Sequence, residues 1–146
     1  MNVTSLDFEH ITFADWRKMW IDYLGQSADS MAEGIHKHTY MRIRHSKGNL
    51  LGFLAVTDRP VGFAHYYLHP STYSLTDACT LEDLYVAPQA RGNGIGRWLI
   101  ETVAHRAKEA GASVLNWKTR PSNQSAIALY EKIATRTEFL SFRMQL

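Results

Sequence analysis

The feature that most constrains this chain is a glycine cluster between a strand-like and a helix-like stretch. Residues 91–96 read Arg-Gly-Asn-Gly-Ile-Gly, directly after the apolar stretch 81–86 and directly before apolar residues that recur at helical spacing. The first N–H groups of a helix lack intrahelical partners, and the helix dipole adds about half a positive charge there. Glycines remove the Cβ atoms and allow the positive φ angles of an anion-binding turn. The cluster therefore predicts a phosphate or pyrophosphate site.

Size and composition limit the classes of protein to be considered. The chain has 146 residues and a net charge of +2, which suits a single domain over residues 1–146. Its Lys and Arg residues are scattered and no run of 18 apolar residues occurs, so we expect neither a nucleic-acid partner nor a membrane segment. Cys79 is the only cysteine, is expected to be a small buried hydrophobe, and leaves no intrachain disulfide possible. A cytoplasmic protein is the expectation.

The order of the periodic stretches predicts an α/β (α+β mixed) fold. Thr12 and Asp15 read as the start of a first helix and Gly25 as its end. Three mid-chain strands read as an antiparallel meander, followed by a parallel crossover, so we expect a central, mostly antiparallel mixed sheet flanked by helices. Helices are expected over 10–26, 28–44, 95–110 and 122–133, and strands over 3–6, 50–57, 61–69, 78–86, 113–119 and 137–146.

Four histidines in the N-terminal region do not follow a metal-site pattern. His36 and His38 would point about 200° apart on a helix, which is poor spacing for two ligands of one ion. We therefore expect no metal and interpret the four as solvated surface residues: His10, His36, His38 and His45.

Two familiar phosphate-binding loops do not match the glycine cluster. A Walker loop requires Gly-Lys-Ser/Thr after its glycines, and that sequence is absent. In a dinucleotide fingerprint counted from Gly92, the third glycine would fall on Arg97, and the next strand ends without an acidic residue. The pattern that remains is Arg91-x-x-Gly94-x-Gly96 after a strand ending in Leu-Tyr-Val.

This pattern resembles the coenzyme A signature of the GNAT superfamily of N-acetyltransferases. A second stretch, Asn-Gln-Ser-Ala-Ile-Ala-Leu-Tyr-Glu-Lys at 123–132, is similar to the family's tyrosine helix, and the element order agrees over nearly the whole chain. Within the family, the chain looks closest to the small amine, histone and D-amino-acid acetyltransferase-like branch. It departs from the family where residues 132–139 lack the usual Gly-Phe after the tyrosine helix.

The resemblance implies the GNAT acyl-CoA N-acyltransferase fold, in which two splayed strands form a slot for acetyl-CoA as co-substrate. The strand 81–86 would bond the pantetheine arm through its main chain, and the following loop would hold the pyrophosphate. The tyrosine helix would contribute Asn123 beside the pantetheine arm. The implied cofactor-binding residues are Leu84, Tyr85, Val86, Arg91, Gly92, Asn93, Gly94, Ile95, Gly96, Arg97, Asn123 and Tyr130.

Acetyl transfer to an amine needs a base, because an alkylamine of pKa about 10.4 is mostly protonated at pH 7. Glu82 and Asp83 are neighbours on a strand and face opposite sides, so one of them is expected to meet the substrate. The resemblance to polyamine-acetylating relatives favours Glu82, with Asp83 as an anchor; a solvated acidic pair is the alternative. Tyr130 is the candidate acid for the leaving thiolate, with structural packing as its alternative.

The acceptor site is less defined in the sequence. Side chains that could line it, or could equally pack in the core, are His65, His69, Tyr66, Tyr67, Tyr73 and Trp117. The expected function is acetyl transfer from acetyl-CoA to the primary amine of a small molecule, such as a polyamine or amino acid, by direct attack in a ternary complex. The alternatives are a protein-lysine or histone-type acetyltransferase, a non-catalytic acyl-CoA sensor, and a nucleotide-binding domain of another type. The apolar segment 137–146 suggests a homodimer.

Overall fold

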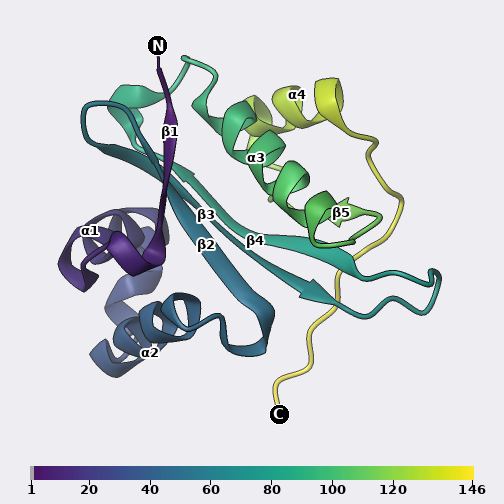
Figure 1. Cartoon of the computed structure of the whole chain (residues 1–146), viewed down its shortest axis with the longest axis horizontal. Helices are drawn as coiled ribbons and strands as arrows, with labels where there is room; N and C mark the ends of the chain where they lie inside the picture. The colour runs from purple at the N-terminus through teal and green to yellow at the C-terminus, as the bar shows by residue number, and fades with distance from the viewer. Residues whose placement is uncertain (1) are drawn as a thin grey trace.

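The computed structural model describes residues 2–146 and consists of a five-stranded sheet with helices on both faces (Figure 1). The strands lie in sequence order, β1 to β4 pair in antiparallel fashion, and β5 pairs parallel to β4. The expected mixed, mostly antiparallel sheet is therefore confirmed. The strands are β1 (Thr4–Asp7), β2 (Leu50–Val56), β3 (Pro60–His69), β4 (Ala78–Val86) and β5 (Leu115–Asn116).

Four α-helices form within residues 2–146, in the stretches where helices were expected, and the second begins at Glu33 instead of residue 28. They are α1 (Phe13–Leu24), α2 (Glu33–Arg44), α3 (Ile95–Glu109) and α4 (Gln124–Ile133). The predicted start of α1 is confirmed, because the Asp15 N–H donates to Thr12 Oγ1 at 3.1 Å. Its predicted end is also confirmed, since Gly25 follows α1 with a φ of +56°.

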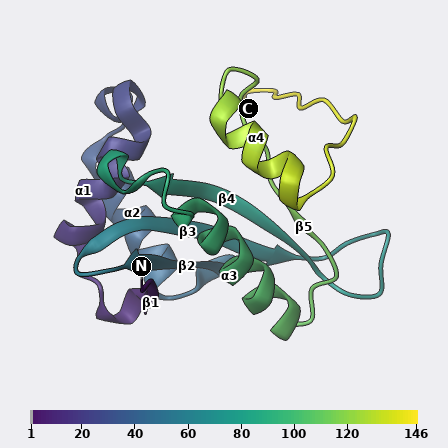
Figure 2. The ribbon, with the colours of Figure 1, turned by 90° about the horizontal axis from the view of Figure 1, so that it is seen from above.

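Two apolar cores lie on opposite faces of the sheet. Neighbouring residues of a strand point to opposite faces, so Phe53 of β2 packs on the side of α3 and Leu54 on the side of α1 and α2. Seen from above, α3 crosses one side of the sheet and α1 and α2 lie on the other (Figure 2). The fully buried side chains that anchor the helices are Leu99 and Val103 of α3 and Trp16 of α1.

The two strands that should form the cofactor slot separate early. β5 pairs with β4 at two positions, Cys79 with Leu115 and Thr80 with Asn116. Beyond Thr80, the edge of β4 that faces β5 has no strand partner within residues 2–146. The expected strand 113–119 is therefore reduced to two residues. Backbone N–H and C=O groups at such an edge need other partners, which leaves room for an extended ligand.

The expected terminal strand at 137–146 is wrong. In the described chain this segment contains no strand, and it runs from α4 past the β5 edge to the C-terminus (Figure 1). A strand requires a partner edge, and β5 offers only two residues. The large apolar side chains of the segment are therefore exposed, at 80% or more of their area: Phe139, Leu140, Phe142, Met144 and Leu146.

The surface interpretation of the histidines is wrong for His36. This residue is 2% exposed, and its Nδ1 accepts a hydrogen bond from Trp20 Nε1 at 3.0 Å. An indole N–H inside a core needs an acceptor, and a histidine one helix away supplies it. The interpretation is correct for His10, His38 and His45, which are exposed.

Candidate active site

A cavity of about 490 Å³ lies between β4, the segment 117–123 and α4, and we refer to it as the β4–α4 cavity. It exists because β5 leaves β4 after two residues. Several residues predicted from the sequence meet in it, together with others that the sequence did not single out. The lining residues are Tyr23, Leu81, Glu82, Leu84, Trp117, Lys118, Thr119, Arg120, Ser122, Asn123 and Tyr130.

Glu82 reaches the cavity from an irregular point of β4. The register with β3 shifts there, so that His65 lies opposite Asp83 and Tyr66 lies opposite Leu81. Glu82 is the extra residue of this bulge and is exposed. Bulges bend a strand and redirect a side chain, often beside active sites. The bulge therefore leaves Glu82 without a partner residue on β3 and places its side chain at the cavity.

Asp83 is tied to the protein interior. Its Oδ1 accepts a hydrogen bond from the Tyr23 hydroxyl at 2.9 Å, and its Oδ2 lies 3.0 Å from Nδ1 of His65. His65 is 1% exposed and in turn accepts from Trp16 Nε1 at 3.0 Å. The adjacent acids thus have different environments, with Glu82 at the cavity and Asp83 in a hydrogen-bonded network.

Tyr130 of α4 faces the cavity with its ring set edge-on against Trp117, at 5.4 Å between ring centroids and 79° between planes. Burial raises the pKa of Tyr130, so the phenol keeps its proton at neutral pH. Asn123, at the start of α4, donates from Nδ2 to Thr119 Oγ1 at 3.1 Å, which fixes the cavity wall.

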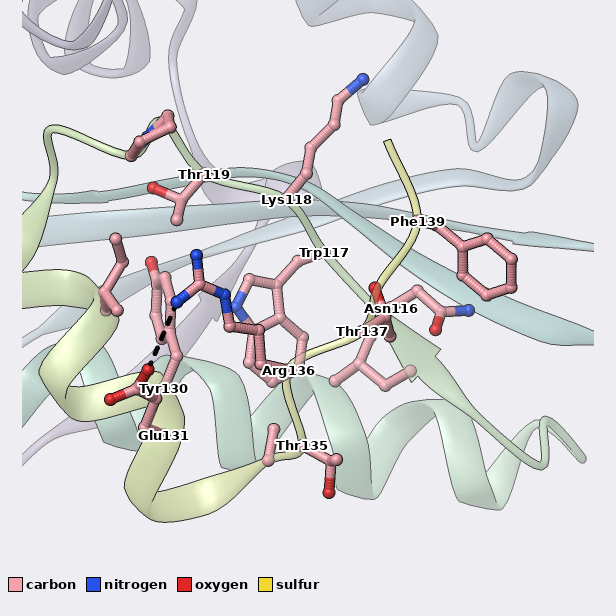
Figure 3. A pocket seen from close by; sticks show the side chains of 14 residues that line it. Asn116, Trp117, Lys118, Thr119, Tyr130, Glu131, Thr135, Arg136, Thr137 and Phe139 are labelled. Atoms are coloured by element: carbon pink, nitrogen blue, oxygen red, sulfur yellow. Dashed lines mark ion pairs between the residues drawn. The ribbon is translucent and has the colours of Figure 1, made fainter. Parts of the chain in front are cut away.

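A smaller cavity of about 250 Å³ lies beside the same wall and shares Trp117, Lys118, Thr119 and Tyr130 with the first. Figure 3 shows these four side chains, with Arg136 of the C-terminal segment beside Tyr130. Arg136 forms an exposed ion pair with Glu131 at 3.8 Å. The C-terminal segment therefore bounds this second cavity, and its placement affects the wall on which Tyr130 lies.

The glycine cluster forms an open turn at the start of α3. Gly92 and Gly94 have φ angles of +78° and +79°, and a Cβ on either would meet no atom within 4 Å. The first hydrogen bond of α3 runs from Trp98 N–H to the Gly94 carbonyl at 3.0 Å, so three preceding N–H groups, of Ile95, Gly96 and Arg97, have no intrahelical partner in the described chain. This arrangement suits a pyrophosphate.

Side chains around the turn are held in place by local bonds. Arg91 Nε donates to the Val86 carbonyl at 2.9 Å, and Asn93 Nδ2 donates to the Arg91 carbonyl at 3.2 Å. Arg97 pairs with Glu101 at 2.7 Å. The Val86 carbonyl is therefore already occupied, whereas Leu84 lines the β4–α4 cavity and the Tyr85 side chain is buried.

Of the side chains considered for an acceptor site, Trp117 alone lines the cavity. Tyr73 is 99% exposed in a loop, and Tyr66 is buried in the core on the α3 side. His69 bonds to Thr80 through Nε2 at 2.9 Å, and Tyr67 packs beside His69. Sequence reasoning missed Tyr23, whose only signal was its place in the apolar periodicity of α1.

Within residues 2–146, His, Cys, Asp and Glu side chains do not gather in a group of three or more suited to a metal ion. In the same range, no helix combines the length and the apolar character needed to cross a bilayer.

Comparison with known proteins assigns the family. The model of the acetyltransferase (GNAT) family matches residues 8–134, which include the β4–α4 cavity and the glycine turn. The chain belongs to the GNAT acetyltransferase family. This GNAT enzyme is therefore an acyltransferase, and the fold implied by its sequence motifs is the observed one.

Relatives with assigned activities are also acetyltransferases. D-amino-acid N-acetyltransferase HPA3 of Saccharomyces cerevisiae is 34% identical over 131 residues, which cover 88% of this GNAT chain and 81% of the yeast protein. Thialysine N-epsilon-acetyltransferase of Caenorhabditis elegans is 34% identical over 99 residues, covering 64% and 61% of the two chains. Both names describe transfer to small molecules.

Solved structures agree in fold. The aminoglycoside acetyltransferase AAC(6')-Iy, solved with a bisubstrate analogue of coenzyme A and acetylneamine, superposes with a TM-score of 0.85 at 18% identity, covering 100% of this chain and 99% of that one. A ribosomal-protein-alanine N-acetyltransferase of Brucella melitensis gives a TM-score of 0.75 at 20% identity, covering 99% and 98%. At these identities the likeness concerns the fold alone.

Proposed function

We propose that this GNAT enzyme transfers the acetyl group of acetyl-CoA to the primary amine of a small molecule, by direct attack in a ternary complex. The observation that carries the proposal is that Glu82 and Tyr130, which are 48 positions apart in the sequence, line one cavity at the point where β4 and β5 separate. A carboxylate and a phenol on one cavity supply the base and the acid that the transfer requires.

Acetyl-CoA fits the described residues. The unpaired edge of β4 after Thr80 offers the pantetheine amides main-chain partners at Leu84 and at the N–H of Val86. The open turn of Arg91 to Arg97 offers N–H groups to the pyrophosphate, and no Cβ blocks the approach at Gly92 or Gly94. Asn123 lies where it can contact the arm between them. When bound, the co-substrate supplies an activated acyl thioester.

Glu82 acts as the base of the reaction and Tyr130 as its acid. Glu82 removes a proton from the ammonium nitrogen, directly or through water, which frees the lone pair for attack on the thioester carbonyl. A C–N bond forms, the C–S bond breaks, the nitrogen releases a second proton as the amide forms, and the thiolate takes up one proton. Tyr130 then donates its proton, or a hydrogen bond, to the departing thiolate. The raised pKa of Tyr130 keeps that proton in place until the thiolate forms.

The names of the relatives favour a small acceptor over a protein lysine. The yeast and nematode proteins are named for a D-amino acid and for thialysine, and a relative in Nocardia farcinica, 32% identical over 81 residues, is named for L-2,4-diaminobutyric acid. Each of these acceptors carries an amine and a carboxylate. Lys118 and Arg120 line the β4–α4 cavity and could pair with such a carboxylate.

We also propose that the protein is cytoplasmic and forms a homodimer through the segment 137–146. The support for the dimer is the row of exposed apolar side chains on this segment, which has no strand partner in the described part of its own chain. Light scattering on the eluting protein would measure the mass in solution. A mass of one chain at all concentrations would contradict the dimer.

Release of free coenzyme A thiol tests the enzymatic proposal. The protein is incubated with acetyl-CoA and, in turn, D- and L-amino acids, thialysine, diaminobutyrate, polyamines and lysine peptides. We expect thiol release with at least one small amine, and a loss of about 100-fold or more in Glu82→Gln without loss of acetyl-CoA binding. Tight acetyl-CoA binding with no thiol release from any amine would instead indicate a sensor.

A further inference from the structure

Four side chains form a continuous hydrogen-bonded chain that ends in the β4–α4 cavity. Trp16 Nε1 lies 3.0 Å from His65 Nε2, His65 Nδ1 lies 3.0 Å from Asp83 Oδ2, and Asp83 Oδ1 lies 2.9 Å from the Tyr23 hydroxyl. Trp16 and His65 are 0% and 1% exposed, and the Asp83 side chain is 18% exposed. Of these four side chains, only Tyr23, the last in the hydrogen-bonded series, lines the cavity.

The donor and acceptor of each hydrogen bond in this series can be assigned by starting from Trp16. An indole nitrogen only donates, so His65 Nε2 must accept, and the ring proton then lies on Nδ1 and is donated to Asp83. An ionised carboxylate only accepts, so the Tyr23 hydroxyl must donate to Asp83. Burial raises the pKa of Tyr23, and Asp83 raises it further, so the hydroxyl keeps this proton.

The Tyr23 hydroxyl can only accept hydrogen bonds from a ligand in the cavity. With its proton committed to Asp83, the Tyr23 oxygen has only lone pairs to offer to a ligand. The ring of Tyr23 cannot easily turn away, because it stacks on Trp20 at 5.5 Å and meets Phe63 edge-on at 5.6 Å. Tyr23 is therefore a fixed hydrogen-bond acceptor that shares the cavity with Glu82.

We propose that the Tyr23 oxygen accepts an N–H hydrogen bond from the attacking amine and holds its nitrogen for proton transfer to Glu82. Asp83, His65 and Trp16 are positioning residues that keep Tyr23 in the accepting orientation. This inference rests on the proposed amine acetylation. It adds a selection rule, since an amine nitrogen can donate to Tyr23 and Glu82 together, whereas a hydroxyl acceptor has a single proton and cannot.

Tyr23→Phe is the decisive variant, because it keeps the ring and its packing and removes only the hydroxyl. We expect the KM for the amine to rise about tenfold or more, as for loss of a hydrogen bond to a charged partner, with the acetyl-CoA dissociation constant unchanged. Thermal unfolding of the variant, compared with the unmodified protein, checks that the fold is retained.

A matched pair on α1 tests the positioning residues. Trp16→Phe removes the N–H that fixes His65, whereas Trp20→Phe keeps an aromatic ring against Tyr23 and removes an indole N–H that donates to His36. We expect Trp16→Phe to raise the amine KM severalfold more than Trp20→Phe. In a Tyr23→Phe background, Trp16→Phe should add no further increase, because the two act through one group.

The outcomes separate this inference from the proposed function. If the unmodified protein releases no thiol with any amine, the proposed function fails and the role of Tyr23 fails with it. If the unmodified protein is active and Tyr23→Phe has the same amine KM, only the role of Tyr23 is refuted. If Trp16→Phe and Trp20→Phe raise KM equally, or Trp16→Phe adds its full effect to Tyr23→Phe, the positioning role is refuted.

Discussion

Replacing Gly94 by alanine isolates the backbone of the glycine turn from its steric surroundings. Gly94 has φ +79° and ψ 3°, and a Cβ there would meet no atom within 4 Å, so the substitution creates no clash. Its cost comes from holding an L-residue in a left-handed conformation, about 1–2 kcal/mol. The free turn can relax by giving up this conformation, and the bound turn cannot. Acetyl-CoA affinity should therefore fall about 5- to 30-fold.

Gly111→Ala is the matched control. Gly111 has a φ of +93° and equally open surroundings, but it follows the opposite end of α3. The 15 residues of α3 separate the two glycines by about 22 Å at a rise of 1.5 Å per residue. We expect Gly111→Ala to lower the free energy of unfolding by about 1–2 kcal/mol, with no change in acetyl-CoA affinity.

Isothermal titration with acetyl-CoA measures the affinity, and denaturant unfolding measures the stability of both variants. The reasoning is refuted if Gly94→Ala binds as tightly as the unmodified protein. It is also refuted if Gly111→Ala loses as much affinity, because the effect would then reflect general destabilisation and not the turn.

Two further predictions concern single groups. Tyr130→Phe should lower kcat by about 100-fold and leave acetyl-CoA affinity within about twofold, measured by thiol release and titration; an unchanged kcat would reduce Tyr130 to its packing on Trp117. Burial raises the pKa of the Cys79 thiol to about 11, so the folded protein should resist thiol reagents at pH 8 and react once unfolded. Rapid labelling of the folded protein at pH 8 would contradict the burial of Cys79. Because the pKa of the thiol in the folded protein lies above the reference value of 9.0, its contribution to the free energy of unfolding is full below about pH 9 and is lost as the pH rises towards 11.

The sheet and the glycine turn were predictable because their signals are local. Alternation of apolar residues predicted β2 and β3. Thr12 caps the start of α1, and Gly25 and Gly94 adopt positive φ angles, so each of these signals depends on backbone geometry within a few residues. The meeting of Glu82 and Tyr130 in one cavity could be expected from the family motifs, although the bulge that redirects Glu82 left no mark in the sequence.

What could not be predicted depends on contacts between distant segments. The burial of His36 depends on the Trp20 indole that donates to it, and the orientation of Tyr23 depends on Asp83, which accepts a hydrogen bond from its hydroxyl. The segment 137–146 has the alternation of a strand, but a strand also needs an edge with which to pair. Alternation of apolar residues shows which side chains could be buried on one face of a strand. Whether a neighbouring strand edge is available for pairing depends on the whole fold, so the sequence pattern does not reveal it.

A crystal structure with acetyl-CoA bound tests the central claim most directly. Our account requires the pyrophosphate oxygens to lie within hydrogen-bonding distance of the N–H groups of Ile95, Gly96 or Arg97, and the thioester carbonyl to lie in the cavity between Glu82 and Tyr130. A ligand bound elsewhere, or one whose acetyl group lies outside that cavity, would contradict it.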